Sequence, residues 1–479
     1  MTENARDLPV RAGVRINAKD EVPSDPWRWQ TTEPATGAGH AQILGGTRTE
    51  ASRAVDAAAA ALPDWAATPV ARRAAILREI AAALRTEPVT AELAELTSRE
   101  TGKRLAEARA EVGLSAGFFE WFADAVSVRS GTVLDVVPGL RHQVSEHPLG
   151  VVAVLTPWNF PLSIPARKIA PALAAGCTVL FKPSEVAASS ALRLAEIVER
   201  FVPAGVIGTV LGDPPMVSET WLSDRRVRGL SFTGSTRVGR DLAVAAAPRF
   251  VRCVLELGGN APLVVLDDAD LDRAVDVLMV AKYRNNGQSC IAANQVWVPR
   301  RQLDEFASRF AAASNRLRLG DPLDQASTLG PLALPTDPAR VEALLEQSGG
   351  EVWRGDVVLP ERGHFQRPAF AVRPVPDSSL RREEIFGPAV SVSGYDELGQ
   401  VLDTVADGPY GLGGYVVGEP NRAAEVARAL DVGIVGVNNG TPNTPRVPFA
   451  GLKDSGLGVE GGYAGLEAFL TTRTVAVSG

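Results

Sequence analysis

VVAVL (Val151–Leu155) precedes TPWNFP, TVLF (Thr178–Phe181) precedes KPSE, VRGLSF (Val227–Phe232) precedes TGSTRVG, and VRCVLE (Val251–Glu256) precedes LGGN. Each apolar run has the length of a strand, and the segments between them, PARKIAPALAAG, SSALRLAEIVERF and RVGRDLAVAAA, suit helices. Strands that alternate with helices predict a parallel sheet with helices on its faces. Ligands of such sheets bind beyond the carboxyl ends of the strands, which is where all four polar motifs lie.

The rest of the chain extends this α/β pattern in both directions. Helical patterns cover about Glu50–Arg85 and Thr90–Val126, and residues 131–147 read as a β-rich excursion. After residue 260, strand-like runs such as APLVVL, QVWVP, FGPAVSV, GLGGYVVG and VGIVGVN continue the alternation with helical segments. The first 25 residues are polar and are predicted to form a loose arm. The sequence contains no long linker, so we expect closely packed domains.

Length, charge and cysteine usage exclude several classes of protein. A chain of 479 residues suggests two to four domains. Its net charge of −7 argues against a surface for nucleic acid or an anionic membrane, and no apolar run reaches the length of about 18 residues that suggests a membrane span. Three cysteines without a CxxC pair, and four scattered histidines, argue against disulfides and against a metal site. The N-terminal region lacks the apolar stretch of a signal peptide, so we expect a cytoplasmic protein.

Two of the polar motifs are candidates for binding a nucleotide. GSTRVG (Gly234–Gly239) follows a strand and opens a helix, where free backbone N–H groups face an anion; a glycine turn made for packing is the alternative. Lys182 and Glu185 follow another strand and could bind the hydroxyls of an adenosine ribose, although solvated charges at a helix start are the commoner reading. A carboxylate at Glu185 would repel a 2′-phosphate and favour NAD over NADP.

Three further residues carry candidate chemistry. Cys290 follows a glycine turn and could act as a nucleophile, whereas Cys177 and Cys253 lie inside apolar runs and are better explained as structural. No histidine stands in a motif that would support a cysteine hydrolase. Glu256 ends a strand and could act as a general base, and the amide of Asn159 in the WNFP turn could stabilise an oxyanion.

Seven motifs in a fixed order are far more specific than any one of them. TPWNFP, KPSE, FTGST, ELGGN, GQSC, EIFGP (Glu384–Pro388) and PFAGLKDSG (Pro448–Gly456) follow one another along the chain. This series resembles the aldehyde dehydrogenase superfamily from about Thr32 to the C-terminus. The resemblance implies an α/β aldehyde dehydrogenase-like fold that forms a homodimer or homotetramer. Its parts would be a Rossmann-like cofactor domain (1–127 and 148–257), an α/β catalytic domain (258–465) and a small β oligomerisation segment (128–147 and 466–479).

The resemblance also assigns roles. Cys290 would attack an aldehyde, Asn159 and the Cys290 N–H would hold the oxyanion, and hydride transfer to NAD (preferred) or NADP would leave a thioester. Glu256 would then activate water to release the carboxylic acid. The cofactor site would comprise Thr156, Trp158, Lys182, Ser184, Glu185, Gly234, Ser235, Gly239, Leu257, Glu384 and Phe386.

Two arginines favour a substrate with a distal carboxylate. Arg284 and Arg167 match the positions at which succinate-semialdehyde dehydrogenases place their carboxylate-binding arginines, and a guanidinium can donate two parallel hydrogen bonds to a carboxylate. Arg167 also occurs in members acting on uncharged aldehydes, so Arg284 discriminates more. The substrate-binding serine of those enzymes falls at Asn443, beside Thr444, which departs from their pocket. Ala450 replaces a common glycine of the PFAGLKDSG motif.

Three alternatives stay open at this point. The substrate could be an uncharged aliphatic or aromatic aldehyde. The acyl acceptor could be coenzyme A instead of water, although members of that kind typically lack the base that Glu256 supplies. The chain could also be a non-enzymatic homologue, which the complete set of Cys290, Glu256 and Asn159 disfavours.

Overall fold

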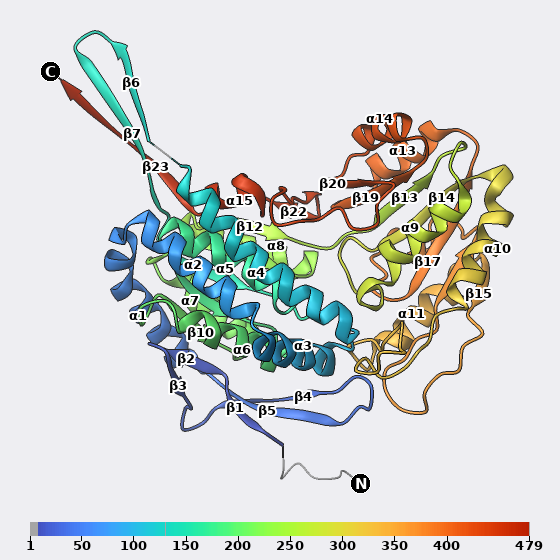
Figure 1. Ribbon diagram of the computed structural model, residues 1–479, viewed down its shortest axis with the longest axis horizontal. Helices are drawn as coiled ribbons and strands as arrows, with labels where there is room; N and C mark the ends of the chain where they lie inside the picture. The colour runs from blue at the N-terminus through green and yellow to red at the C-terminus, as the bar shows by residue number, and fades with distance from the viewer. Residues whose placement is uncertain (1–7, 130, 479) are drawn as a thin grey trace.

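The computed structural model describes residues 8–129 and 131–478, and these form two α/β lobes with a projecting β-arm (Figure 1). One lobe is built on an eight-stranded sheet and the other on a seven-stranded sheet. The expected α/β class with parallel sheets is therefore confirmed.

The eight-stranded sheet contains the four strands predicted from the polar motifs. Five central strands run parallel to one another. Their apolar side chains are buried on both faces, as expected of strands covered by helices on both sides. The strand order is β22 (Gly456–Leu457), β12 (Arg252–Glu256), β11 (Val227–Thr233), β8 (Val151–Leu155), β9 (Thr178–Lys182), β10 (Ile207–Val210), β2 (Val14–Ile16) and β3 (Lys19–Glu21).

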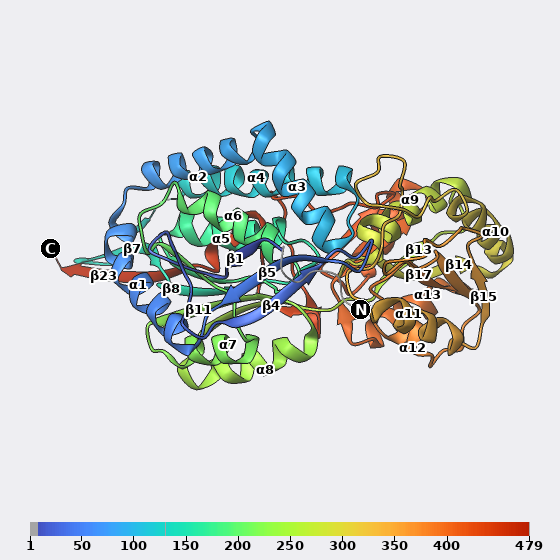
Figure 2. The ribbon, with the colours of Figure 1, turned by 90° about the horizontal axis from the view of Figure 1, so that it is seen from below.

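Helices cover both faces of this sheet (Figure 2). Successive side chains of a strand point to opposite faces, so Val152 and Val154 pack in one core while Val151 and Ala153 pack in the other. The first core is shared with α2 (Val70–Leu84), α3 (Glu87–Thr101), α4 (Leu105–Ser127), α5 (Ser163–Ala175) and α6 (Ala188–Glu199), and the second with α1 (Arg48–Ala67), α7 (Pro214–Ser223) and α8 (Thr236–Ala246).

Each of the two predicted N-terminal helical stretches is a pair of helices. The break between α1 and α2 falls at Thr68-Pro69, where Thr68 is extended and Pro69 caps the second helix without an N–H of its own. The break between α3 and α4 falls at Gly102, whose φ of 73° ends α3 in the left-handed conformation. Lys103 follows the second break directly, and it contacts the turn after β8 that is described below.

The prediction of a loose arm over the first 25 residues is wrong for the part that the structure describes; residues 1–7 lie outside it. Residues 10–21 form β1 (Val10–Ala12), β2 and β3. Strand β2 pairs antiparallel with β10 and buries Val14 and Ile16 almost completely. Burial of these two side chains outweighs the polar composition around them. Strand β1 joins β5 (Gly39–Gly45) and β4 (Trp27–Thr32) in a small sheet.

The seven-stranded sheet forms the second lobe. Helices α9 (Leu271–Tyr283) and α10 (Leu303–Ser314) pack on one face, and α13 (Leu398–Asp407) and α14 (Pro420–Ala429) on the other. Helices α11 (Asp337–Glu346) and α12 (Ser379–Arg382) pack near one edge of this sheet. The strand order is β15 (Glu351–Arg354), β16 (Ala369–Val372), β17 (Ala389–Tyr395), β14 (Ala293–Pro299), β13 (Ala261–Val265), β19 (Gly413–Val417) and β20 (Ile434–Val437).

The C-terminal region returns to the first lobe. Strand β22 pairs antiparallel with β12, and α15 (Gly462–Glu467) contacts α4 and α5, although both elements fall inside the range predicted as catalytic domain. The short strands β18 (Tyr410–Gly411) and β21 (Leu452–Lys453) pair nearby. The arm consists of β6 (Thr132–Val137), β7 (Leu140–Pro148) and β23 (Leu470–Ser478), in the order β23-β7-β6.

Candidate active site

The predicted site residues meet at the carboxyl edge of the eight-stranded sheet because the parallel strands end in register. Leu155 of β8 lies opposite Lys182 of β9, and Thr233 of β11 lies opposite Glu256 of β12. The WNFP turn follows β8, and Ser235 caps helix α8 directly after β11, where its side chain accepts a hydrogen bond from the Val238 N–H. Sequence periodicity alone therefore placed these motifs correctly.

A cavity of about 240 Å³ lies between this edge and the second lobe. Predicted catalytic and cofactor residues from both lobes line it together. The predicted residues among its walls are Trp158, Asn159, Gly234, Ser235, Leu257, Cys290, Glu384 and Phe386; Pro157, Thr233, Gly258, Leu334 and Asp337 complete it. Leu334 and Asp337 were not predicted, because they come from a loop and a helix start without a motif.

Glu384 and Phe386 reach the cavity from the second lobe. The Gly259 N–H donates to Glu384 Oε1 at 3.2 Å, and the rings of Trp158 and Phe386 pack edge to face, with centroids 5.5 Å apart. Burial raises the pKa of Glu384 to about 7, against the lowering effects of the Gly259 N–H, Arg340 and Lys282. The cavity thus offers apolar walls and, in Glu384, a carboxylate acceptor from the second lobe.

Cys290 is half-buried and free. Two residues of the turn before it, Asn285 and Asn286, adopt positive φ values of 52° and 58°, which asparagine tolerates better than most residues. Burial, together with the nearby Glu384 and Glu256, raises the pKa of the Cys290 thiol to about 12 against the lowering effect of Arg167. The thiol is therefore protonated at neutral pH in this state, and the proton must leave before the sulfur attacks.

Glu256 is buried at the end of β12. Neither of its carboxylate oxygens meets hydrogen-bonding geometry with a described group. Burial raises its pKa well above the usual value, and Glu460 raises it further, while Lys168 and Arg167 lower it. Such a carboxyl group is tuned to take up a proton more readily than an exposed one.

Lys168 and Glu460 form a buried ion pair close enough to influence Glu256, and sequence reasoning missed both. The hydroxyl of Ser231 on β11 joins the pair. A lysine inside the apolar helix α5 is a signal that could have been noticed, but its partner lies 292 residues further along the chain.

Other predicted cofactor residues lie outside this cavity. Lys182 is nearly buried, and its ammonium lies 3.8 Å from the Glu185 carboxylate. Ser184 accepts a hydrogen bond from the Val186 N–H at 3.3 Å, as in a local turn. Thr156 has a buried hydroxyl, and its N–H donates to the Lys182 carbonyl at 3.2 Å.

Gly239 acts through packing. A Cβ atom there would lie 2.3 Å from a methyl group of Leu257, which itself lines the cavity. The glycine therefore lets α8 approach the cavity wall, which is the packing explanation considered for this motif.

Arg167 and Arg284 each stack on aromatic rings. The Arg167 guanidinium is buried, 4.5 Å from the ring centroid of Phe449 and 5.1 Å from that of Phe118, and its Nε has no partner in the described structure. The Arg284 guanidinium lies 5.3 Å from the ring of Phe160, next to Asn159. Within the described residues, neither arginine forms an ion pair with a carboxylate, unlike most arginines on the surface.

Asn443 and Thr444 lie in the loop that packs against α4. Asn443 Oδ1 is buried without a partner among the described groups, whereas Thr444 is exposed. The same loop places Pro445 against Gly117 of α4. Of the two, Asn443 is the better placed to contact a buried ligand.

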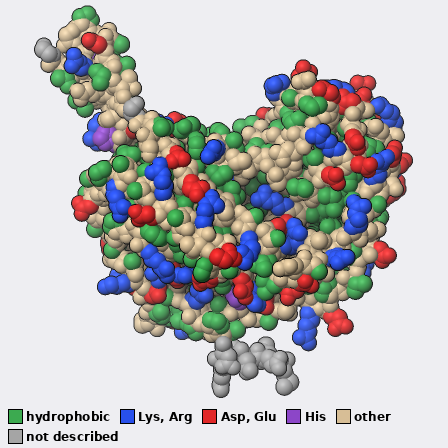
Figure 3. Space-filling model, in the orientation of Figure 1, with side chains coloured by type: hydrophobic (Ala, Val, Ile, Leu, Met, Phe, Trp, Pro, Cys, Tyr) green, Lys and Arg blue, Asp and Glu red, His purple; other side chains and the backbone are tan. Residues whose placement is uncertain are grey.

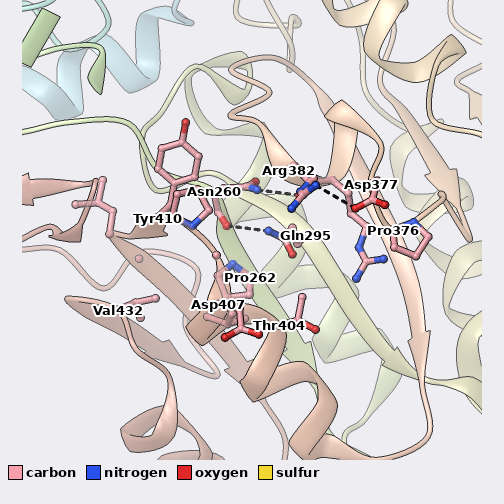
Figure 4. A pocket seen from close by; sticks show the side chains of 16 residues that line it. Asn260, Pro262, Gln295, Pro376, Asp377, Arg382, Thr404, Asp407, Tyr410 and Val432 are labelled. Atoms are coloured by element: carbon pink, nitrogen blue, oxygen red, sulfur yellow. Dashed lines mark hydrogen bonds and ion pairs between the residues drawn. The ribbon is translucent and has the colours of Figure 1, made fainter. Parts of the chain in front are cut away.

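A second cavity, of about 310 Å³, lies in the second lobe, between Asn260, Arg382 and Tyr410 (Figure 4). None of the predicted catalytic residues lines it. Among the described residues, no group of three metal-ligating side chains comes together, and no helix is both long and apolar enough to cross a membrane.

An α/β edge that gathers a free cysteine, a buried carboxyl group and an amide beside an apolar cleft suits an enzyme that acts through a cysteine nucleophile. Residues 22–475 match the model of the aldehyde dehydrogenase family, and the chain belongs to that family.

Named relatives agree with this assignment. The chain is 38% identical over 460 residues to glutarate-semialdehyde dehydrogenase of Pseudomonas putida, and the match covers 94% of each chain. It is 39% identical over 459 residues to the NADP+-dependent succinate-semialdehyde dehydrogenase of Escherichia coli, and this match covers 93% of each chain. The crystal structure of succinate-semialdehyde dehydrogenase from Burkholderia pseudomallei superposes with a TM-score of 0.94 at 36% identity, over the full length of both chains.

Proposed function

We propose that this aldehyde dehydrogenase oxidises an aldehyde that carries a distal carboxylate, with succinate semialdehyde as the leading substrate. The observation that carries the proposal is the state of Arg167 and Arg284, which stack on rings beside the site but pair with no carboxylate among the described residues. The buried Arg167 guanidinium, and the partly buried one of Arg284, would be stabilised by an anionic partner. The names of the glutarate- and succinate-semialdehyde relatives are consistent with such a partner.

Two cavity residues, Cys290 and Asn159, and the buried Glu256 next to Leu257 divide the chemistry among them. The Cys290 sulfur, once deprotonated, adds to the aldehyde carbon, and Asn159 donates a hydrogen bond to the oxyanion that develops. Bound NAD(P)+ supplies the acceptor for the hydride that leaves the tetrahedral carbon, and the product on Cys290 is a thioester. Glu256 then takes a proton from water as the water adds to the thioester, and collapse of the adduct releases the acid and the Cys290 thiolate.

The residues present fit an NAD(P) molecule. Trp158, Phe386 and Leu257 offer apolar walls to a nicotinamide ring, and Glu384 can accept a hydrogen bond from a ribose hydroxyl. The N-terminus of the eleven-residue helix α8 faces the same cavity through Gly234 and Ser235, and free N–H groups of this kind favour a phosphate.

The choice between NAD and NADP is proposed to favour NAD. Glu185 is partly exposed beside Lys182 at the end of β9, where its charge would oppose a 2′-phosphate. The relative from Escherichia coli carries NADP+ in its name, so the preference needs direct measurement. A higher kcat/KM with NADP than with NAD would reverse this part of the proposal.

The arm is proposed to join subunits into a homodimer or homotetramer. Apolar side chains gather on it in Figure 3, and Val133, Val136 and Val475 are 63%, 71% and 47% exposed. Exposed apolar patches of this kind mark contact surfaces. A monomer in sedimentation equilibrium would contradict the assembly.

The three cysteines are free, which fits the reducing cytoplasm.

The substrate proposal is tested by comparing kcat/KM for succinate semialdehyde, glutarate semialdehyde and butanal in wild type and in Arg284→Ala. Loss of one charged contact should lower kcat/KM for the two acids by roughly 10- to 150-fold and leave butanal within about threefold. Arg109→Ala, an exposed arginine on α4, is the control. The proposal fails if wild type prefers butanal, or if Arg284→Ala slows all three substrates equally.

A further inference from the structure

A buried ion pair contacts the main chain of the Asn159 turn. Lys103 follows the Gly102 break between α3 and α4, and Glu111 lies two turns further along α4. Their side chains are 1% and 2% exposed and in direct contact. A buried pair of charges is costly to desolvate, and this cost can exceed the Coulombic gain between the two groups.

Both members of the pair hold the main chain of one turn. The Lys103 ammonium donates to the carbonyl oxygen of Asn159 at 2.8 Å. Glu111 Oε1 accepts from the N–H groups of Leu162 and Ser163, both at 3.0 Å. The pair therefore fixes both ends of the turn between β8 and α5 that presents the Asn159 side chain.

The same turn is tied to the loop that carries Cys290. Asn285 Nδ2 donates to the carbonyl oxygens of Asn159 and Gln288, both at 2.9 Å, and Asn159 Nδ2 donates to the Gln288 carbonyl at 3.2 Å. Asn286 Nδ2 donates to the Gly102 carbonyl at 2.9 Å, next to Lys103. The break after α3, the Asn159 turn and the Cys290 loop thus form one hydrogen-bonded unit.

Among the described residues, one of the two amide hydrogens of Asn159 has no assigned acceptor. An amide nitrogen carries two N–H donors, and one of those of Asn159 goes to Gln288. Asn159 and Cys290 line the same cavity, so the second donor is available to an oxyanion formed at the sulfur. Its direction depends on where the Asn159 main chain is held, because a donor must already be aimed at the charge when the charge develops.

We propose that Lys103 and Glu111 are positioning residues for aldehyde addition: by clamping the turn from Asn159 to Ser163 they aim the free Asn159 N–H at the developing oxyanion. The inference rests on the role proposed for Asn159 and adds two residues that touch neither substrate nor cofactor. A clamp of this kind predicts a specific defect, in which carbonyl addition slows while the sulfur itself stays accessible and reactive.

The test uses the full-length variants Lys103→Met and Glu111→Gln, with Arg109→Met on the same helix as the control. Aldehyde addition and hydride transfer are measured together as the pre-steady-state burst of NAD(P)H. Cys290 reactivity is measured as alkylation by iodoacetamide, a displacement at a saturated carbon that forms no oxyanion. Cofactor affinity is measured by quenching of protein fluorescence.

Removing one oxyanion donor costs about 100- to 1,000-fold in enzymes of other kinds, and misaiming it costs less. We therefore expect Lys103→Met to slow the burst by roughly 10- to 100-fold, with alkylation and cofactor affinity within about twofold of wild type. Glu111→Gln should show a smaller loss of the same kind, because its amide oxygen can still accept from Leu162 and Ser163. Arg109→Met should be unchanged.

Two results would overturn the inference: an unchanged burst in Lys103→Met, or burst and alkylation rates that fall together. If Lys103→Met does not fold, because it leaves Glu111 buried without a partner, the double variant Lys103→Met/Glu111→Leu removes both charges and is held to the same outcomes. Asn159→Ala separates the two proposals. A normal burst in Asn159→Ala would refute the oxyanion role itself, whereas a slow burst there beside a normal one in Lys103→Met would refute only the clamp.

Discussion

Replacing Glu256 with glutamine should separate the two halves of the reaction. The side chain keeps its size and its place at the end of β12, but an amide cannot take a proton from water. Aldehyde addition and hydride transfer do not need that proton, so one equivalent of NAD(P)H per active site should still appear in a burst. Hydrolysis of the thioester should then limit turnover.

The structure sets the expected magnitudes. General-base catalysis is typically worth about 100- to 10,000-fold, so the steady-state rate should fall within that range while the burst rate changes by less than about fivefold. The stability of the folded protein should rise in the same variant, although its steady-state rate falls. The pKa of Glu256 is raised in the folded state by burial and by Glu460, so ionisation of this group opposes folding as the pH rises above its unfolded pKa of about 4.3. Glutamine removes that penalty at neutral pH, and each kcal/mol regained should raise Tm by about 1 °C in a chain of this length.

The assay is stopped-flow detection of NAD(P)H, with thermal unfolding measured at pH 4 and pH 8. The Tm gain should be present at pH 8 and nearly absent at pH 4, where the wild-type carboxyl is mostly protonated in both states. Glu219→Gln, an exposed residue of α7, serves as the control. If Glu256→Gln abolishes the burst as well as the steady state in a folded protein, Glu256 is needed before hydrolysis and the assignment as a deacylating base is refuted.

Four further outcomes are expected. Cys290→Ser should bind cofactor but lose turnover by more than about 1,000-fold, because a serine hydroxyl stays protonated; turnover near that of wild type would remove Cys290 from the mechanism. Alkylation of wild-type Cys290 by iodoacetamide without cofactor should speed up by nearly tenfold per pH unit between pH 7 and 9, since its thiol pKa is raised to about 12 by burial, and a plateau in that range would contradict the raised pKa. Gly239→Ala should raise the cofactor Kd by roughly fivefold or more, because the added methyl group pushes Leu257 into the cavity, and an unchanged Kd would show that Leu257 yields elsewhere. Glu185→Ser should narrow the preference for NAD; if the ratio of kcat/KM values for the two cofactors does not move, Glu185 does not set it.

The sequence by itself determined the features that are local along the chain. Strands, turns and helix starts are encoded by consecutive residues, and parallel strands in register bring their ends to one edge, so Asn159, Glu256 and the segment around Ser235 could be placed at one site before any coordinates were known. The order of the seven motifs added the family and, with it, the role expected of Cys290.

Tertiary structure alone decided which distant groups set the electrostatics and geometry of that site. Glu256 owes its raised pKa to burial and to Glu460, about two hundred residues away, and the Asn159 turn owes its position to Lys103 and Glu111. The N-terminal strands likewise exist because Val14 and Ile16 find apolar space beside β10. Such effects depend on desolvation and on contacts across the chain, which no local pattern records, because the free energy of a buried charge or side chain is fixed by whichever groups the fold places around it.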